Sequence, residues 1–223
     1  MWEKIVWLFV KFLYFVLMVL PTLNIVYPHK VIWEDKKKTK EALKKPCVVY
    51  SNHTGYSDGL FMLDCMRKYH LYTFVGKDWY EKKQLNWLFR NLRYIPLDRQ
   101  QMDTTWLVKG KKILDQGESI YFFPEGHTSK DGNMLEFQPG FLMLAKQCKA
   151  TLVPICLDRK IKPFHFFRVI IGTPQDLDLK GEGRPSVVLK ERSEVCRQTV
   201  IRLKKKYGNP KFFADDVKNF VEE

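Results

Sequence analysis

The sequence has few cysteines, and their arrangement argues against two common ways of stabilising a small domain. Its 223 residues include 5 cysteines, an odd number. No two of them form a Cys-x-x-Cys pair, and most lie in apolar runs, which is typical of buried thiols in a reducing compartment. This pattern disfavours a disulfide scaffold and a zinc framework. No group of side chains has the spacing of metal ligands, and so we expect neither a metal nor a cofactor.

Negative charge is also scarce. Asp and Glu number 25 against 38 Lys and Arg, which gives a net charge of +13. Such an excess suggests a polyanionic partner, either nucleic acid, an anionic membrane surface or a phosphorylated substrate. The alternative is a solvated basic surface without a specific partner. Because the lysines are dispersed, nucleic acid is the least favoured partner, and we expect none.

The N-terminal apolar run, from Ile5 to Tyr27, lacks the small-x-small cleavage site of a signal peptide. The part from Ile5 to Leu20, ahead of Pro21, would span about 24 Å as a helix, less than the roughly 30 Å of a hydrocarbon core. Trp2 and Trp33 are aromatics of the kind found at the headgroup layer. We predict that residues 1–33 form a membrane-anchoring helical segment that is interfacial or re-entrant, with a full span and a plain core helix as alternatives.

The remaining chain divides into a basic linker (34–45), an α/β domain (46–210) and a C-terminal tail (211–223). The run from Asp35 to Lys40 is basic, and the positive-inside rule keeps such runs cytoplasmic. We therefore predict that the protein is at the cytoplasmic face of the cell membrane, with membrane lipids as partners.

No internal repeats occur, and from residue 46 short strand-like runs alternate with helix-like stretches. This alternation predicts a mixed, largely parallel β-sheet flanked by helices. One helix should contain Trp106 and Gly110 and stop at Gly117. The predicted strands are Cys47–Ser51, Leu71–Val75, Tyr94–Leu97, Ser119–Phe123, Leu152–Leu157 and Phe166–Ile171.

Two catalytic signatures overlap between Ser51 and Leu60, in SNHTGYSDGL. Ser57 lies in G-x-S-x-G, the nucleophile elbow of serine hydrolases. An elbow needs its serine at a turn that joins strand to helix directly, whereas this strand ends near Ser51, so Ser57 and Asp58 look more like a helix cap. The other signature, N-H-x-x-x-x-D, pairs His53 with Asp58.

A carboxylate bound to one imidazole nitrogen fixes the tautomer and leaves the other nitrogen to accept a proton. From this stretch alone, a merely structural loop histidine is an equal alternative. Two further strands also end in polar residues: one leads to Glu125, Gly126 and Thr128, and the other to Asp98 and Arg99. Because α/β proteins place ligands at the carboxyl edge of the sheet, the three strand ends together favour a binding or catalytic site.

These residues resemble the glycerolipid acyltransferases, specifically the lysophosphatidate (1-acyl-glycerol-3-phosphate) acyltransferase family, over roughly residues 46 to 157. The family's four motifs occur in order, and together they are far more specific than any one alone. They are matched by Asn52, His53 and Asp58; by Ile95-Pro-Leu-Asp-Arg99; in part by Phe123-Pro-Glu-Gly126 and Ser129; and by Val153-Pro-Ile155.

The chain departs from the family pattern at several positions. His127-Thr128 stands where the third motif has Thr-Arg, so an arginine usually assigned to the acceptor's phosphate is missing. Arg93 replaces the glycine that opens the second motif, and Gln138-Pro139 replaces basic residues ahead of Gly140. The side chains of Arg93, Arg99, Lys77 and Lys130 are candidates to supply the lost charge.

The resemblance implies that His53, oriented by Asp58, deprotonates an acceptor hydroxyl that attacks an acyl thioester. Backbone N–H groups near Gly126 would stabilise the oxyanion. The implied donor is an acyl thioester, either acyl-CoA or acylated acyl carrier protein, and the implied acceptor is a lysophospholipid, most simply 1-acyl-sn-glycerol-3-phosphate, giving phosphatidic acid. The implied substrate-binding residues are Arg99, Glu125, Gly126, Thr128, Lys77 and Asn52.

Other interpretations stay open. Arg99 can instead form a surface ion pair with Asp98, and Glu125 can cap a loop. The acceptor can be a different lysolipid. A serine lipase or thioesterase using Ser57 is the enzymatic rival, and a non-catalytic basic membrane-binding module is the rival from another class.

Overall fold

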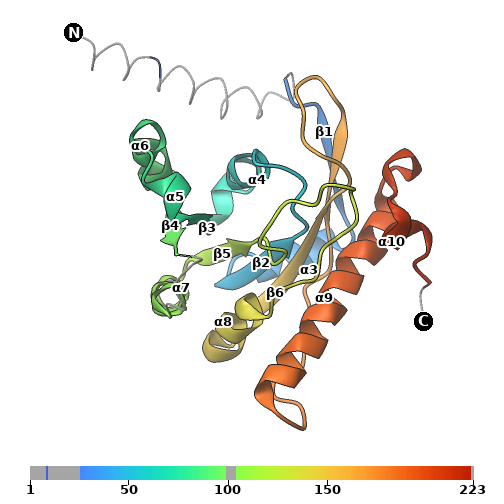
Figure 1. Ribbon diagram of the computed structural model, residues 1–223. Helices are drawn as coiled ribbons and strands as arrows, with labels where there is room; N and C mark the ends of the chain where they lie inside the picture. The colour runs from blue at the N-terminus through green and yellow to red at the C-terminus, as the bar shows by residue number, and fades with distance from the viewer. Residues whose placement is uncertain (1–8, 10–25, 99–103, 222–223) are drawn as a thin grey trace.

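The computed structural model describes residue 9 and residues 26–98 and 104–221 (Figure 1). Within them, the strands form one sheet of 7 strands in the order β1-β7-β6-β2-β5-β3-β4. All neighbouring strands are parallel except β6 and β7. The strands are β1 His29–Trp33, β2 Cys47–Ser51, β3 Leu71–Gly76, β4 Tyr94–Leu97, β5 Ser119–Phe122, β6 Thr151–Leu157 and β7 Phe167–Ile171.

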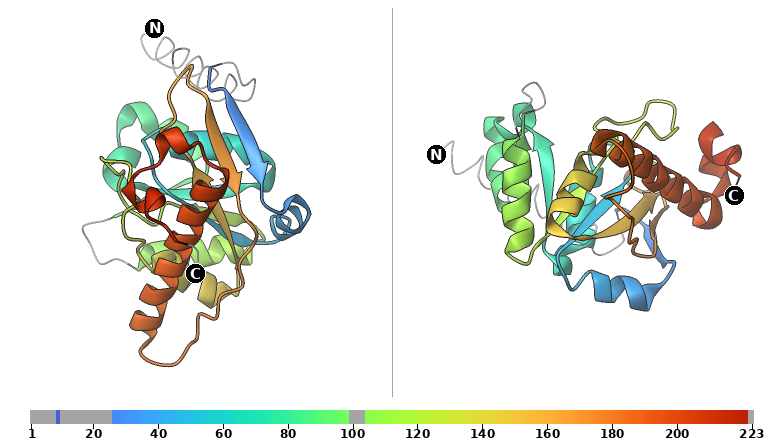
Figure 2. Two further views of the ribbon diagram at one scale, coloured as in Figure 1. Left: turned by 90° about the vertical axis from the view of Figure 1, so that its right-hand side faces the viewer. Right: turned by 90° about the horizontal axis from the view of Figure 1, so that it is seen from below.

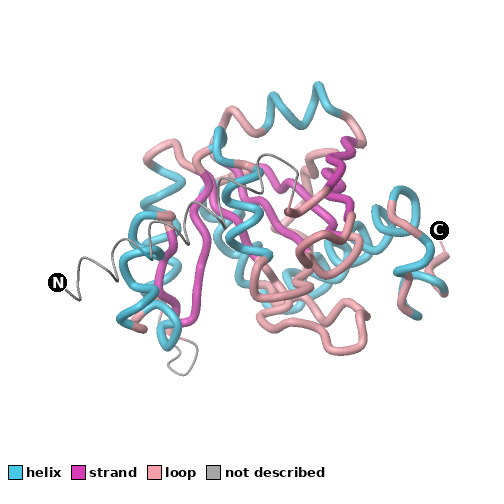
Figure 3. The backbone as a smooth tube through the Cα atoms, turned by 90° about the horizontal axis from the view of Figure 1, so that it is seen from above, coloured by secondary structure: helices cyan, strands magenta, loops and turns pink. Residues whose placement is uncertain are grey.

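Helices flank this sheet, so the predicted mixed, largely parallel α/β architecture is confirmed (Figure 3). The α-helices are α3 Lys36–Ala42, α4 Asp58–Cys65, α5 Lys77–Tyr80, α6 Lys83–Asn91, α7 Thr105–Asp115, α8 Gly140–Cys148, α9 Pro185–Tyr207 and α10 Asp215–Lys218. Short 3-10 helices are η2 Arg67–Tyr69 and η3 Pro210–Phe212.

A hydrophobic core lies on each face of the sheet, and α9 and α3 cover opposite faces (Figure 2). Helices α7, α8 and α9 bury residues such as Leu144 and Val200 on one face, whereas α4 buries Phe61 on the other. Gly110 allows α7 and α8 to approach, because a Cβ there would come within 2.8 Å of Leu144. Every residue of the central strand β2 is buried, as expected for a strand covered on both faces.

The N-terminal anchoring prediction falls almost entirely outside the described residues. No helix within the described ranges is long and apolar enough to cross a membrane. His29–Trp33, inside the range predicted as anchor, pairs with β7 as strand β1. The predicted basic linker contains α3, whose first turn is capped by Asp35, and the predicted tail contains α10 with its buried Val217.

Candidate active site

Strands β6, β2 and β5 are neighbours at the centre of the sheet, and the motifs that follow β2 and β5 meet at its carboxyl edge. The parallel pairing of Val49 with Tyr121 sets an offset of 72 residues between β2 and β5. His53 and Glu125, which follow these strands, are separated by the same 72 residues and are hydrogen-bonded. The register of the sheet thus carries these two motifs to one place.

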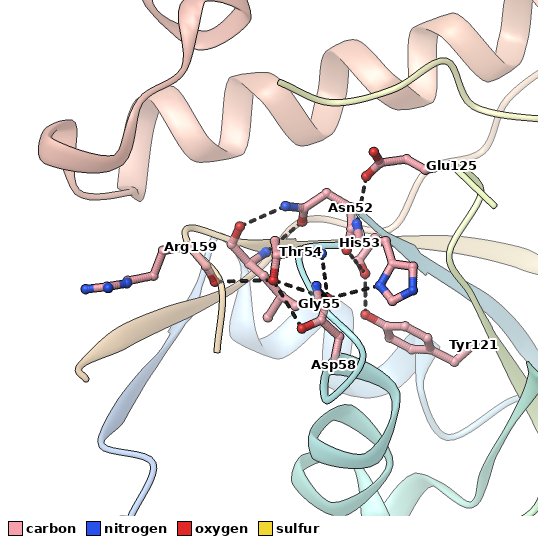
Figure 4. Close-up of polar contacts among 10 residues, drawn as sticks. Asn52, His53, Thr54, Gly55, Asp58, Tyr121, Glu125 and Arg159 are labelled. Carbon is pink, nitrogen blue, oxygen red and sulfur yellow. Dashed lines mark hydrogen bonds and ion pairs between the residues drawn. The ribbon is translucent and has the colours of Figure 1, made fainter. Parts of the chain in front are cut away.

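His53 and Asp58 form the pair that the sequence predicted (Figure 4). His53 Nδ1 lies 3.1 Å from Asp58 Oδ2, with the histidine side chain 18% exposed and the aspartate fully buried. The imidazole also stacks on Phe123, with ring centroids 4.3 Å apart. Since Nδ1 faces the carboxylate, Nε2 is the nitrogen left to exchange a proton.

Asp58 organises its own loop as well as the histidine. Its Oδ2 accepts hydrogen bonds from the backbone N–H of Thr54 at 2.5 Å and of Gly55 at 2.7 Å. The Thr54 hydroxyl also lies 3.1 Å from Asp58 Oδ1. These donors stabilise a buried negative charge that would otherwise be costly. The carboxylate therefore holds the His53 backbone and ring in a defined geometry.

Glu125 connects the loops after β2 and β5. Its Oε1 accepts from His53 N–H at 2.7 Å, and its Oε2 accepts from Leu135 N–H at 2.8 Å. Burial raises the pKa of this carboxyl from 4.5 to about 7, against the opposing effect of those two hydrogen bonds. Both carboxylate oxygens of Glu125 accept from backbone N–H groups. These contacts are those of a carboxylate that caps a loop, and they leave neither oxygen without a partner for an acceptor to replace.

Asn52 also has a structural set of contacts. Its side-chain amide donates to Leu157 O at 2.9 Å and accepts from Leu157 N–H at 2.8 Å. The residue therefore fixes the end of β2 to the end of β6, rather than presenting its amide to a substrate. Next to it, Tyr121 donates to the Ser51 hydroxyl at 2.5 Å within the buried sheet.

The other predicted site residues are more dispersed. Gly126, at φ +70°, has a conformation that favours glycine, and its N–H donates to Phe123 O at 3.1 Å. Thr128 is half-buried in the same loop. Lys77 begins α5 and lies 3.7 Å from Asp98. Arg99 lies outside the described residues, and β4, which leads to it, is separated from β2 by β5 and β3.

The structure also shows the surroundings of Arg93, a candidate for the missing positive charge, and of Ser57, the candidate nucleophile. Arg93 contacts His70 and Glu118 beside the amino ends of β3 and β5, which is the sheet edge away from His53. Ser57 occupies the N-cap position, since its carbonyl accepts from Phe61 N–H at 3.0 Å. It is not at a direct turn from strand to helix, because β2 ends at Ser51.

Three residues that shape the site were not among the predicted site residues. Thr54 and Phe123 contact the His53–Asp58 pair directly, and Lys160 packs over Gly55, with its Cε 3.0 Å from where a Cβ would be. The position of Thr54 inside the first motif was a signal for its role. Lys160 carried no such signal, because only the fold brings the end of β6 to this loop. No cluster of potential metal ligands occurs within the described residues.

The fold and the site together define a class: an α/β protein with a histidine–carboxylate pair at the carboxyl edge of its sheet. Comparison with known families then identifies the group within that class. The family model described as Acyltransferase matches residues 30–158. The chain belongs to this Acyltransferase family, and the resemblance seen in the sequence is confirmed.

Curated relatives share the motif-bearing half of the chain. The chloroplastic 1-acyl-sn-glycerol-3-phosphate acyltransferase BAT2 of Brassica napus is 29% identical over 114 residues, covering 50% of this chain and 33% of that protein. The 1-acyl-sn-glycerol-3-phosphate acyltransferase of Bacillus subtilis is 24% identical over 133 residues, covering 57% and 65%. This chain thus spans a third of the Brassica relative and under two thirds of the Bacillus one.

A solved structure shares the fold. The 1-acyl-sn-glycerophosphate acyltransferase PlsC of Thermotoga maritima matches with a TM-score of 0.59 and 20% identity, covering 81% of this chain and 75% of that one. At this identity the likeness concerns the fold alone.

Proposed function

We propose that this protein transfers a fatty acyl group from an acyl thioester to the free hydroxyl of a lysophospholipid. The observation that carries the proposal is the contact of His53 with the fully buried Asp58 at the carboxyl edge of the sheet. The relatives are 1-acyl-sn-glycerol-3-phosphate acyltransferases, which favours 1-acyl-sn-glycerol-3-phosphate as acceptor and phosphatidic acid as product. The proposed donor is acyl-CoA or acylated acyl carrier protein.

In the proposed reaction, Nε2 of His53 takes the proton of the acceptor hydroxyl while that oxygen attacks the thioester carbonyl. Asp58 stabilises the resulting imidazolium. The new C–O bond forms, the C–S bond breaks, and His53 returns its proton to the leaving thiolate. The protein's own groups complete this cycle, so neither a metal nor a cofactor is part of the proposal.

We also assign groups that would stabilise the oxyanion and groups that would bind the acceptor's phosphate. The Gly126 N–H is already bonded to Phe123, but those of His127 and Thr128 make no hydrogen bond within the described chain. We assign oxyanion stabilisation to these two N–H groups. Lys77 and Arg99 are proposed to bind the acceptor's phosphate, with Arg99 placed by sequence alone.

We further propose that the apolar N-terminal segment anchors the protein at the cytoplasmic face of the membrane. The apolar run from Ile5 to Tyr27 and the basic stretch after it support this location. Membrane lipids would then be partners as well as substrates.

A different lysolipid acceptor is the second candidate, and Thr128 is the observation that favours it. Threonine offers a hydroxyl where the family has a cation, so recognition of a phosphomonoester is weaker at this position. An acceptor with a larger headgroup fits this change. The serine hydrolase alternative is disfavoured by the N-cap position of Ser57.

The test is to incubate acyl-CoA or acyl carrier protein thioester with a panel of lysolipids, comparing wild type with His53→Ala and Ser57→Ala. We expect transfer by wild type and Ser57→Ala, and a loss of about 10²–10⁴-fold in His53→Ala. Transfer by both wild type and His53→Ala, or by neither, would contradict the proposal. A fluorophosphonate should label neither wild type nor Ser57→Ala.

A further inference from the structure

A series of hydrogen bonds connects the C-terminal helix α10 to the backbone of His53. Met134 N–H donates to Asp216 Oδ2, on α10, at 2.8 Å. The next residue along the chain, Leu135, donates its N–H to Glu125 Oε2 at 2.8 Å. Glu125 Oε1 in turn accepts from His53 N–H at 2.7 Å. Adjacent amides of one loop therefore join α10 to the carboxylate that holds the catalytic histidine.

The contact between α10 and this loop is reciprocal. Asn133 Oδ1 accepts from Asp216 N–H at 3.1 Å, so that the side chain and the backbone of Asp216 both bind the loop. Arg197, on α9, donates to Met134 O at 3.4 Å. The N–H and the C=O of Met134 are thus both bound by the C-terminal part of the chain, which restricts the loop in more than one direction.

Helix α10 is packed firmly enough to hold the loop. Val217, the residue after Asp216, is fully buried and belongs to the same hydrophobic core as Met134 and Phe137 of the loop. Apolar surroundings of this kind strengthen the hydrogen bonds beside them. Figure 1 shows α10 beside the loop that joins β5 to α8. The region predicted as a C-terminal tail therefore supports this loop.

The same loop carries the groups to which we assign oxyanion stabilisation, the N–H groups of His127 and Thr128. A hydrogen bond from Gln138 N–H to Pro124 O, at 2.9 Å, closes the base of the loop. Because the loop is closed at its base and bound to α10 beyond it, its conformation is restricted between these points. Catalytic groups have to be held within about 0.5 Å of their productive geometry, so a shift of this loop would disturb catalysis.

We propose that Asp216 is a positioning residue of the acyl-transfer site. By binding Met134 N–H, it keeps Leu135 N–H on Glu125. Glu125 in turn keeps the backbone of His53 in its catalytic geometry. No sequence motif points to Asp216, because only the fold brings α10 to this loop. The inference rests on the proposed function, since the geometry it maintains is that of acyl transfer.

The neighbouring aspartate provides a matched control. Asp215 lies on the same short helix, but its side chain is 77% exposed and its carboxylate contacts Lys218 of that helix at 3.2 Å. Asp215→Ala therefore removes a carboxylate from α10 without removing a contact to the loop. Asp216→Ala removes the acceptor for Met134 N–H, whereas Asp216→Asn keeps an oxygen that can accept the same hydrogen bond.

The first measurement is steady-state acyl transfer by the full chain in detergent micelles, with kcat referred to folded protein from urea denaturation. We expect kcat to be about tenfold lower in Asp216→Ala with little change in the KM of the acyl donor, because the transition-state geometry is altered and not binding. Asp216→Asn and Asp215→Ala should keep kcat within about twofold of wild type. A wild-type kcat in Asp216→Ala, or an equal loss in Asp216→Asn, would overturn the proposal.

A variant on the loop side tests the same connection with α10 unchanged. Asn133→Ala removes the acceptor for Asp216 N–H and leaves the carboxylate of Asp216 in place. We expect kcat to fall several-fold, in the same direction as in Asp216→Ala but by less, because one of the two reciprocal bonds remains. An unchanged kcat in Asn133→Ala would count against the connection.

A second measurement, amide hydrogen exchange at single residues, does not depend on activity. The N–H groups of His53 and Leu135 are both bonded to Glu125, so we expect both to exchange several-fold faster in Asp216→Ala than in wild type. Val153, buried in the centre of β6, is the reference and should be unchanged. Unchanged exchange at His53, or equal acceleration at Val153, would refute the positioning by Asp216.

The two proposals fail in different ways. If wild type transfers no acyl group to any lysolipid, the proposed function is refuted, and hydrogen exchange at His53 still decides whether α10 controls its backbone. If wild type transfers acyl groups and Asp216→Ala does so equally well, only the positioning by Asp216 is refuted.

Discussion

The two edges of the sheet carry polar groups of different kinds. At the carboxyl edge, Asn52, Asp58 and Glu125 are at most 5% exposed, and each binds backbone groups of a neighbouring loop or strand. At the opposite edge, side chains that include Lys40, Lys44, Lys45 and Lys68 line an open hollow of about 560 Å³. Buried hydrogen bonds fix geometry, whereas exposed charges do so only weakly.

The open hollow and the candidate site therefore lie at different edges of the sheet. The 560 Å³ hollow lies away from His53, beside the starts of β2, β3 and β5. The candidate site is marked by buried side chains that hydrogen-bond neighbouring loops and strands, and by a histidine whose Nδ1 faces a carboxylate while Nε2 is left to exchange a proton. Substitutions on the two edges should therefore have very unequal effects.

The largest expected effect is that of Asp58→Asn. An amide cannot replace a carboxylate that accepts from His53, Thr54 and Gly55, and it removes the charge that stabilises an imidazolium. We expect the acyl-transfer kcat to fall by about 10²–10⁴-fold. Asp115→Asn, at an exposed ion pair with Lys111, is the matched control and should leave kcat unchanged. Equal activity in both variants would contradict the assigned function of Asp58.

A second substitution, Asn52→Ala, measures how strongly the buried edge is held together. It leaves the N–H and the C=O of Leu157 without their side-chain partner inside the sheet. We expect the free energy of unfolding to fall by about 2–4 kcal/mol, measured by urea denaturation. Asn219→Ala, at an exposed position, should change it by less than about 0.5 kcal/mol. A similarly small change for Asn52→Ala would remove the distinction between the two edges.

Much of the fold could be predicted from the sequence, because its strands are short apolar runs with polar ends. The runs predicted at Cys47–Ser51 and Tyr94–Leu97 match β2 and β4 residue for residue. Strand β1 was missed because His29–Trp33 directly follows the apolar N-terminal run and looks like its continuation. Only its long-range parallel pairing with β7 distinguishes it as part of the sheet.

The His53–Asp58 contact was predictable because the two residues are close in sequence. Asp58 is five residues from His53, so their pairing could be inferred from one loop. The bond from His53 N–H to Glu125 spans 72 residues, and it depends on which strands are neighbours. Single-sequence reasoning named Glu125 as a candidate substrate-binding residue, but it could not assign its partners.

The Glu125→Gln substitution tests whether burial raises the pKa of this carboxyl, because a raised pKa makes the free energy of unfolding depend on pH. The unfolded carboxyl ionises near its ordinary pKa of 4.5, whereas burial keeps the folded one protonated up to about pH 7. The folded state therefore holds the extra proton, and its stabilising effect is present below pH 4.5 and lost as pH rises to about 7. Across this window, the free energy of unfolding of wild type relative to Glu125→Gln should fall by up to about 3 kcal/mol.

The measurement is a series of urea denaturation curves for both proteins between pH 4 and pH 8, about the range that the titration spans. The relevant quantity is the difference between the two proteins, because other titrating groups contribute equally to each. A difference that stays constant with pH, or grows as pH rises, would contradict a raised pKa at Glu125.

The smallest expected effect belongs to the opposite edge, at Lys44→Ala. Lys44 Nζ lies 2.6 Å from Glu41, but both side chains are about two thirds exposed, at 65% and 64%. Solvent and salt weaken such a pair, so its loss should change the free energy of unfolding by less than about 0.5 kcal/mol. Acyl transfer should be unchanged, since Lys44 is separated from His53 by the length of β2. A large loss of activity in Lys44→Ala would mean that the basic hollow takes part in substrate binding, and that the two edges do not differ in function.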